Sequence, residues 1–297
     1  MRIILRPSGE AAAEQRFAGR RSGMNKSKLQ SVILRTLVYT AAFITFGVLI
    51  CLIAYILIKG IPNLSLDLFS FEYNSENVSL FPALINTVVM TALSLIIAVP
   101  LGVFSAIYLV EYAKRGNKIV GLIRLTAETL SGIPSIVYGL FGFLLFVTAF
   151  SWGYSLLAGA FTLVIMILPV IMRTTEEALK AVPDTFREGS FGLGAGKLRT
   201  VFKIVLPSAV PGILAGVVLS VGRIVGETAA LIYTAGTVAQ IPSGLLGSGR
   251  TLAVHMYALW SEGLNTNQSY ATAVVLLIIV VILNAASSAL AKKISSK

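Results

Sequence analysis

Residues 129–172 read TLSGIPSIVYGLFGFLLFVTAFSWGYSLLAGAFTLVIMILPVIM and contain no Asp, Glu, Lys or Arg. As a helix rising 1.5 Å per residue, these 44 residues would extend about 66 Å, whereas the hydrocarbon core of a bilayer is roughly 30 Å thick. The stretch is too long for one membrane crossing and fits two. The turn is expected at Ser151-Trp152-Gly153-Tyr154, because a tight turn flanked by aromatic residues suits a membrane interface.

The composition of the whole chain agrees with a membrane protein. Hydrophobic residues make up 56% of the 297 residues, charged residues make up 12%, and the mean hydropathy is +0.85. These values exclude an ordinary soluble domain. The single cysteine, Cys51, lies inside an apolar run, so no disulfide can form within the chain.

The uncharged runs predict an all-α integral membrane protein with six transmembrane helices. We expect these helices at Thr36–Ile58, Ala83–Leu109, Leu125–Phe150, Ser155–Met172, Ser208–Ile232 and Ala271–Ala291. Residues 34–297 would form this six-helix domain. Residues 1–33 are expected to be a disordered cytoplasmic extension, and within it Met24 is an alternative start of translation. The extension lacks the apolar core of a secretory signal.

The basic residues predict the orientation of the helices. Of the 24 Lys and Arg residues, 21 fall in the N-terminal segment, the loops after the second and fourth helices, or the C-terminal tail, and two fall in the opposite loops. The positive-inside rule therefore places both termini in the cytoplasm. The net charge of +11 is then explained by topology and by contact with anionic membrane lipid, so we expect no nucleic-acid partner.

The cytoplasmic loop 173–207 reads RTTEEALKAVPDTFREGSFGLGAGKLRTVFKIVLP. Thr174 is expected to cap a charged helix, Pro183 to interrupt it, and Asp184–Phe191 to form a second short helix. Phenylalanines on this second helix would project from a surface kept thin by glycines. A short exposed helix of this kind indicates a docking element for a partner protein, although a solvated linker is the alternative.

The loop resembles that of importer permeases of the ATP-binding-cassette (ABC) class. Their pattern is Glu-Ala-Ala, three residues, Gly, nine residues, Ile, one residue and Leu-Pro. The matching residues here are Glu188, Gly189, Ser190, Gly194, Ile204, Leu206 and Pro207, with small Gly and Ser in place of the two alanines. The resemblance implies a type I ABC importer permease fold. It also implies that residues 188–194 form the coupling helix, which fits a cleft on a separate ATPase subunit.

Three further stretches resemble the A-type permease subunits of high-affinity phosphate importers. They are ETLSGIPSIVYGLFG from Glu128, RTTEEALKAVP from Arg173 and GRIVGETAAL from Gly222. The resemblance implies phosphate as substrate and a bacterial plasma membrane as location. It also implies three kinds of partner: a second homologous permease subunit, two copies of an ATP-binding subunit and an extracytoplasmic phosphate-binding protein. Importers of another oxyanion or small solute, secondary transporters and channels remain alternatives.

The chain itself is not expected to be an enzyme. The run Gly194-Ala195-Gly196-Lys197 resembles part of a phosphate-binding P-loop, but Phe191 stands where that motif needs Gly, and Leu198 stands where it needs Ser or Thr. The sequence has no His/Cys cluster, and its sole histidine, His255, is expected to be structural. We therefore expect no metal and no cofactor.

Two charged residues lie within the predicted fifth helix. Arg223 and Glu227 are four residues apart, hence on one helical face and able to pair. Each costs about 2.5 to 3.5 kcal/mol at the bilayer centre. A salt bridge that merely permits insertion and an anion site explain them equally well on physical grounds. The resemblance implies the translocation path, with Arg223 contacting phosphate and Glu227 holding Arg223 when the path is empty.

The predicted third helix carries its own irregularities. The run Gly132-Ile133-Pro134-Ser135 is expected to produce a kink. Gly139 and Gly142 would allow close contact with another helix, and we favour a packing role for them over a gate. Glu128, near the cytoplasmic start of this helix, is expected to reach water by snorkelling.

Overall fold

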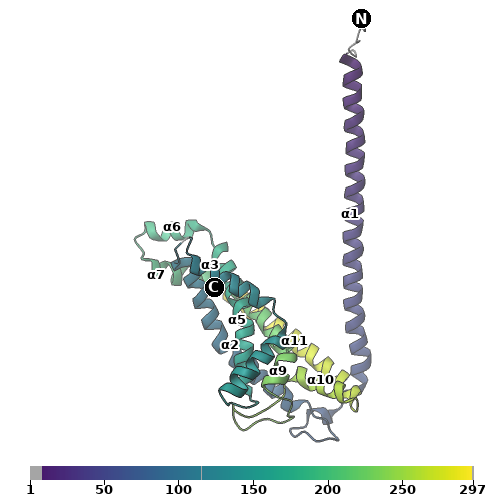
Figure 1. The fold of residues 1–297 in the computed structure, drawn as a ribbon, viewed down its shortest axis with the longest axis vertical. Helices are drawn as coiled ribbons and strands as arrows, with labels where there is room; N and C mark the ends of the chain where they lie inside the picture. Colours follow the sequence, from purple (N-terminus) through teal and green to yellow (C-terminus); the bar gives the residue numbers. More distant parts are fainter. Residues whose placement is uncertain (1–8, 115, 296–297) are drawn as a thin grey trace. The chain divides into compact units, whose positions relative to one another are not determined.

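The computed structural model describes residues 9–114 and 116–295, and no β-strand occurs in these two ranges (Figure 1). The chain divides into two compact units, Met1–Ile56 and Leu57–Lys297. The described residues of the first unit, 9–56, form a continuous helix, which belongs to α1 (Gly9–Gly60). The second unit holds the remaining helices and is described by itself below.

Helix α1 begins well before the predicted first transmembrane segment. Residues 9–33 are helical, where the sequence predicted a disordered extension, and residues 1–8 lie outside the described residues. The physical reason is composition, because the run AAAEQR at residues 11–16 consists of residues with high helix propensity. The part that is long and apolar enough to cross a membrane is Gln30–Asn63, which contains the predicted Thr36–Ile58.

The second unit is built from helices of very different length. Two 3₁₀ turns come first, η1 (Ile61–Asn63) and η2 (Leu66–Phe69). The longer elements are α2 (Phe81–Ile107) with its π-helical end η3 (Tyr108–Tyr112), α3 (Lys118–Ser131), α4 (Ser135–Gly142) with its π-helical end η4 (Phe143–Ala149), α5 (Leu156–Ala181), α8 (Leu206–Val225) and α11 (Thr266–Ser295). The short elements are α6 (Asp184–Gly192), α7 (Lys197–Thr200) with the π-turn η5 (Val201–Val205), α9 (Ala229–Thr234) and α10 (Leu252–Glu262).

Within the described ranges, five helices are long and apolar enough to cross a membrane, and a bent pair supplies a sixth segment. The bent pair is α3 with α4–η4, which meet at 105°. The prediction of one continuous helix over Leu125–Phe150 is therefore wrong, although the kink was expected at the observed place. Pro134 has no backbone N–H to continue the helix. The Tyr138 hydroxyl instead donates to the Leu130 carbonyl, 2.6 Å away across the break.

Two other predicted boundaries are corrected. The predicted fifth helix, Ser208–Ile232, is broken after Val225 and resumes as α9 at Ala229. The predicted fourth helix does not end at Met172, because α5 continues to Ala181. Thr174 therefore caps no new helix, and its hydroxyl donates to the Val170 carbonyl within the same helix, 2.9 Å away.

The turn between η4 and α5 is where the sequence predicts it. Ser151 and Gly153 both adopt left-handed backbone conformations, with φ of 56° and 63°. Trp152 stacks on Phe146 with ring centroids 5.5 Å apart. The Ser155 hydroxyl accepts the Ala158 backbone N–H at 3.2 Å and caps α5. Aromatic stacking and a side-chain cap together fix the reversal of direction.

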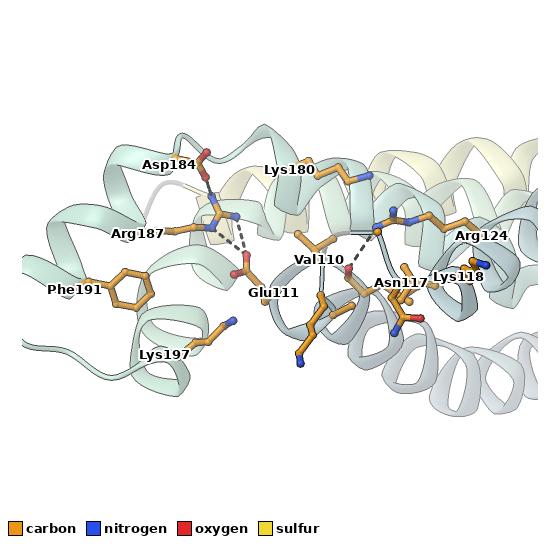
Figure 2. A pocket seen from close by; sticks show the side chains of 16 residues that line it. Val110, Glu111, Asn117, Lys118, Arg124, Lys180, Asp184, Arg187, Phe191 and Lys197 are labelled. Atoms are coloured by element: carbon orange, nitrogen blue, oxygen red, sulfur yellow. Dashed lines mark hydrogen bonds and ion pairs between the residues drawn. The ribbon is translucent and has the colours of Figure 1, made fainter.

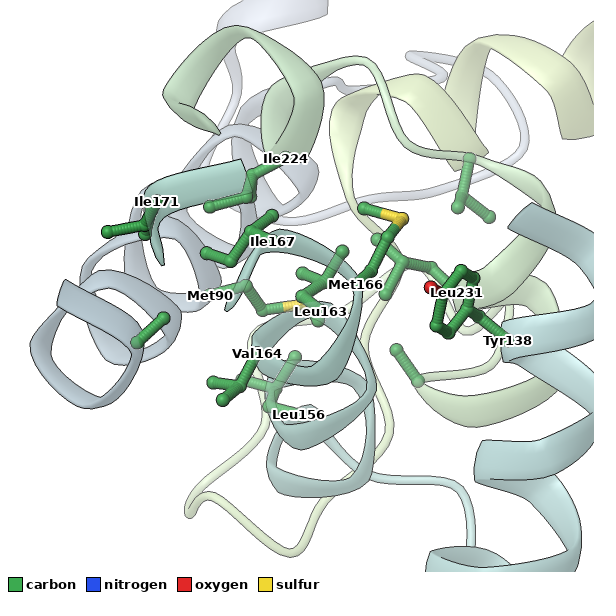
Figure 3. Packing of buried hydrophobic residues seen from close by; sticks show 13 residues of the cluster. Met90, Tyr138, Leu156, Leu163, Val164, Met166, Ile167, Ile171, Ile224 and Leu231 are labelled. Carbon is green, nitrogen blue, oxygen red and sulfur yellow. The ribbon is translucent and has the colours of Figure 1, made fainter. Parts of the chain in front are cut away.

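Helix α5 is the central helix of the second unit. It packs against α2, α8, α3, α4 and α9. Leu163 and Ile167 of this helix are fully buried beside Met90 of α2, Ile224 of α8 and Leu231 of α9 (Figure 3). These four helices therefore share one buried apolar cluster, to which Tyr138 of α4 and Val254 of α10 also belong, and α5 holds their relative positions.

Close packing of α4 depends on glycine, as the sequence predicted. A Cβ atom on Gly139 would lie 2.8 Å from the Ala230 Cα and 3.2 Å from the Ala229 carbonyl oxygen, both on the backbone near α9. A Cβ on Gly142 would overlap the Thr162 hydroxyl of α5. These contacts admit no side chain unless a helix moves.

We expect Gly139→Ala to destabilise the protein by about 1 to 3 kcal/mol, because the obstructing atoms are backbone atoms that cannot rotate away. The measurement is the thermal unfolding midpoint of the purified protein in detergent. Gly121→Ala in α3 is the matched control, since nothing lies within 4 Å of its Cβ position. Equal midpoints for the two variants would contradict the packing interpretation.

Candidate translocation and coupling sites

Two helical stretches are interrupted near each other: the first break lies within a bent candidate membrane span, and the second directly follows the candidate span Lys197–Val225. One break covers residues 132–134 between α3 and α4, and the other covers residues 226–228 between α8 and α9. Helices α4 and α9, which follow the two breaks, pack together. Irregular backbone at membrane depth is tolerated only where it is buried in protein or lines a watery cavity, and interrupted helices often hold the substrate of a transporter. The paired breaks are the candidate translocation site.

Arg223 lies in the last turn of α8, immediately before the second break. Its side chain is partly buried, and its guanidinium is close enough to the Tyr138 hydroxyl of α4 to interact with it electrostatically. No ion pair within 4.0 Å joins it to Glu227, and both are described residues. The predicted pairing is wrong for this structure, because α8 ends at Val225 and the two residues do not share a helical face.

Glu227 contacts the backbone of the second break. The residue is only 8% exposed, and its Oε1 atom accepts the Ala230 backbone N–H at 3.1 Å. The carboxylate thus satisfies a donor that the broken helix would leave free at the start of α9. Glu227 stabilises the break itself, and the Arg223 charge remains available to an anion.

The loop between α5 and α8 contains the predicted coupling helix. Glu188, Gly189 and Ser190 lie in α6, which starts at Asp184 directly after Pro183. Gly194 has φ of +82°, a left-handed conformation that ends α6 and favours glycine. The other predicted coupling residues come later: Ile204 lies in η5, and Leu206 and Pro207 begin α8.

The surface of α6 offers apolar contacts to a partner. Phe186 is 49% exposed and Phe191 is 47% exposed, while Leu193 beyond the helix end is 91% exposed. Ser190, by contrast, is buried, and its hydroxyl lies 2.8 Å from the Thr200 hydroxyl of α7. Ser190 therefore closes the loop internally, and Glu188 and Gly189 are the members of that triplet that face outward.

A buried ion pair joins α6 to the end of α2, and sequence reasoning missed it. The Arg187 guanidinium lies 2.7 Å from the Glu111 carboxylate of η3, and both side chains are mostly buried (Figure 2). Arg187 also donates to the carbonyls of Val182 and Leu179, at 2.8 and 2.9 Å. The partners are 76 residues apart, so no local pattern could have indicated the pair.

Ion pairs also link α3 to the C-terminal part of α5. Arg124 lies 2.7 Å from Glu176, which also pairs with Lys180 at 2.6 Å. Glu128 is exposed, as the snorkelling prediction requires, and lies 3.8 Å from Arg173. The segment before the first break is thereby attached to the helix that leads into the coupling loop.

A second buried charge, Arg250, was also missed. It lies beside α10 and is only 5% exposed. Its guanidinium carbon lies 4.9 Å from the Tyr73 ring centroid, a cation–π contact, and Tyr73 meets the fully buried His255 edge-on at 6.2 Å. Burial, with a smaller contribution from the Arg250 charge, lowers the pKa of His255 from its usual 6.5 to about 3. His255 is therefore neutral at physiological pH.

Residues 98–297 match the family model described as binding-protein-dependent transport system inner membrane component. The chain belongs to this family. It is accordingly a multi-pass inner-membrane permease component, and the two breaks and the coupling loop lie within the matched residues.

Relatives support this membership. The probable ABC transporter permease protein YqgI of Bacillus subtilis is 35% identical over 238 residues, which cover 75% of this chain and 81% of the relative. The phosphate transport system permease protein PstA of Pasteurella multocida is 41% identical over 212 residues, covering 70% and 74%. Both relatives are named as permease proteins, so the family membership places this chain among the permease subunits of ABC transporters and not among their ATPases.

Solved structures agree on the fold. A chain of a bacterial alginate ABC transporter, in complex with its alginate-bound periplasmic protein, matches with a TM-score of 0.59 at 15% identity, covering 85% of this chain and 95% of that one. A chain of the inward-facing MetNI methionine ABC transporter matches with a TM-score of 0.56 at 21% identity, covering 72% and 94%. The predicted type I ABC importer permease fold is confirmed.

We expect Glu111→Gln to destabilise the protein by about 3 to 5 kcal/mol, because it leaves the buried Arg187 charge with only the exposed Asp184 carboxylate as counter-charge. The control is Asp184→Asn, which removes the other carboxylate that pairs with Arg187. That carboxylate is 78% exposed, so its loss should cost less than about 1 kcal/mol. Thermal unfolding and protease cleavage within residues 183–200 report the change, and equal effects of the two variants would refute it.

The buried His255 predicts a pH dependence of stability. In the unfolded chain this imidazole binds a proton near pH 6.5, whereas in the folded chain it does so only near pH 3. The contribution of His255 to the free energy of unfolding is thus lost as the pH falls from about 6.5 towards 3. We expect the unfolding midpoint of His255→Phe to fall less steeply between pH 7 and about 4 than that of the wild type. Parallel curves would contradict this expectation.

Proposed function

We propose that this chain is the transmembrane permease subunit of an ATP-driven phosphate importer. It forms half of the translocation pathway and couples that half to separate ATPase subunits. The observation that carries the proposal is an arginine without an acidic partner among the described residues, placed beside two paired helix breaks. A guanidinium suits the tetrahedral phosphate anion, to which it donates bidentate hydrogen bonds. The relative named as a phosphate transport system permease supports the same substrate.

The proposed assembly contains several other subunits. A second homologous permease subunit completes the pathway, because one chain supplies a single pair of breaks. Two copies of an ATP-binding subunit dock on the cytoplasmic side, each receiving one coupling helix. An extracytoplasmic phosphate-binding protein delivers the anion to the outward segments, in keeping with the family description. This arrangement places both termini of the chain in the cytoplasm, as the basic loops predict.

Energy transfer would begin at α6. Closure of the ATPase pair displaces the exposed face of α6, with Phe186 and Phe191 as its apolar contacts. The Arg187–Glu111 pair passes this displacement to η3 and α2, since both charges are costly to separate inside protein. The Arg124–Glu176 pair connects α5 to α3, which leads to the first break. The helices thereby alternate between two arrangements around the pathway.

Arg223 and Glu227 would serve the pathway in different ways. Arg223 contacts the passing phosphate, whereas Glu227 maintains the break by accepting the Ala230 N–H. Since no ion pair joins Arg223 to Glu227, contact with phosphate falls to Arg223 without an exchange between the two residues.

The test is uptake of radiolabelled phosphate by cells or proteoliposomes carrying the complete complex. We expect uptake to stop on ATP depletion and to be competed by phosphate but not by sulfate or molybdate. Arg223→Lys and Arg223→Gln should lower uptake about 10- to 100-fold, the value of one charge-assisted contact.

Lys59→Gln, which removes an exposed charge elsewhere, is the matched control. Co-purification of the ATPase subunit must show that every variant still assembles. Wild-type uptake by an assembled Arg223→Gln complex would overturn the role of Arg223. Uptake that persists without ATP would overturn the importer itself.

A further inference from the structure

A cavity of about 900 Å³ opens between η3, the start of α3 and the coupling helix α6 (Figure 2). It shares no residue with the two helix breaks. Six basic residues line it, against two acidic ones. The basic residues are Lys114, Lys118, Arg124, Lys180, Arg187 and Lys197. A cavity lined mainly by positively charged side chains favours binding of an anion.

The two acidic residues of the lining do not neutralise it. Both Glu111 and Asp184 are engaged by the same guanidinium, that of Arg187, at 2.7 and 3.2 Å. Arg124 and Lys180 share a third carboxylate, Glu176, which lies outside the lining. The local ion pairs therefore account for three of the six basic residues.

The other three basic residues are lysines without an ion pair among the described residues. Lys114 lies in the loop before α3, Lys118 is the first residue of α3, and Lys197 is the first residue of α7. The Lys197 ammonium lies 5.0 Å from the Tyr112 ring centroid, so an aromatic contact holds it at the cavity. These lysines come from three different segments and meet around one space.

The backbone adds to the positive potential. Helix α3 has 14 residues, and its first turn, capped by Asn117, borders the cavity. The positive end of the helix dipole there favours an anion. Leu109, Val120 and Phe191 contribute apolar wall, so the site is suited to an anion that carries an apolar portion as well as to a free one.

We propose that this cavity binds a phosphate group through Lys114, Lys118 and Lys197. The group belongs either to the headgroup of an anionic phospholipid or to free inorganic phosphate, since basic pockets on the cytoplasmic side of membrane proteins accept such headgroups and lysine binds phosphate as a point charge. A ligand held by these lysines links α3 to α7, which is hydrogen-bonded to the coupling helix α6 through Thr200 and Ser190, so its presence holds the coupling loop against α3 independently of the transported anion.

Binding is measured on the complete complex with two probes. In the first arm, native mass spectrometry follows retention of added phosphatidylglycerol, with phosphatidylcholine as the neutral comparison. In the second arm, equilibrium dialysis follows binding of radiolabelled inorganic phosphate. Neither arm requires transport, so failure of the proposed transport function leaves this test intact, and the reverse also holds.

The decisive variant is K114Q/K118Q/K197Q. Each lost charge should weaken binding about five-fold, so the triple variant should bind on the order of 100-fold more weakly. The charge-keeping variant K114R/K118R/K197R should stay within a few-fold of wild type and shows that the protein still folds. The variant R199Q/K203Q removes two exposed charges outside the lining and should bind as wild type does.

Lysine-dependent binding of phosphatidylglycerol alone assigns the site to a lipid headgroup, and lysine-dependent binding of phosphate alone assigns it to the free anion. Lysine-dependent binding of both means that the site accepts the group from either source. The proposal is overturned if neither probe binds, if the triple glutamine variant binds as tightly as wild type, or if R199Q/K203Q loses as much affinity as that variant.

Discussion

The requirement that backbone polar groups be hydrogen-bonded inside a bilayer governs the structure. Regular helical hydrogen bonding is interrupted at residues 132–134 and 226–228, and at each break a side chain adds a hydrogen bond to the short-range backbone bonds that remain. The Tyr138 hydroxyl bonds to the Leu130 carbonyl, and the Glu227 carboxylate accepts the Ala230 N–H. Tyr138 thus fixes the geometry of the first break and Glu227 that of the second, and Arg223 stands beside both.

Ion pairs connect the elements around these breaks to α6, the helix that we propose docks on the ATPase subunit. Arg187 and Glu111 join the coupling helix to the end of α2, while Arg124 and Glu176 join α3 to α5. The central position of α5, buried against five other helices, means that displacement at one end of the unit reaches all of them. The loop that contains α6 is therefore attached to the packed helices by a buried ion pair.

Much of this architecture could be predicted from sequence, because the length of an uncharged run limits how many times it can cross a membrane. Residues 129–172 required two segments and a turn, and the spacing from Glu188 to Pro207 indicated the coupling loop. The break after Val225 was missed because Gly226 alone does not end a helix, and its compensation by Glu227 is visible only in three dimensions. The Arg187–Glu111 pair could not be predicted, since hydrophobic periodicity carries no information on contacts between residues 76 positions apart.

The glycines of α4 have a mechanical consequence. At Gly139 the backbone of α4 lies directly against the backbone of Ala229 and Ala230 in α9, with no side chain between them. Interlocked side chains resist sliding because each must change rotamer or leave its hole, whereas a smooth contact between backbones presents few such barriers. The contact at Gly139 therefore favours sliding of α4 along α9, and the Thr234 methyl group of α9, which packs at Gly142, limits how far the two helices can slide.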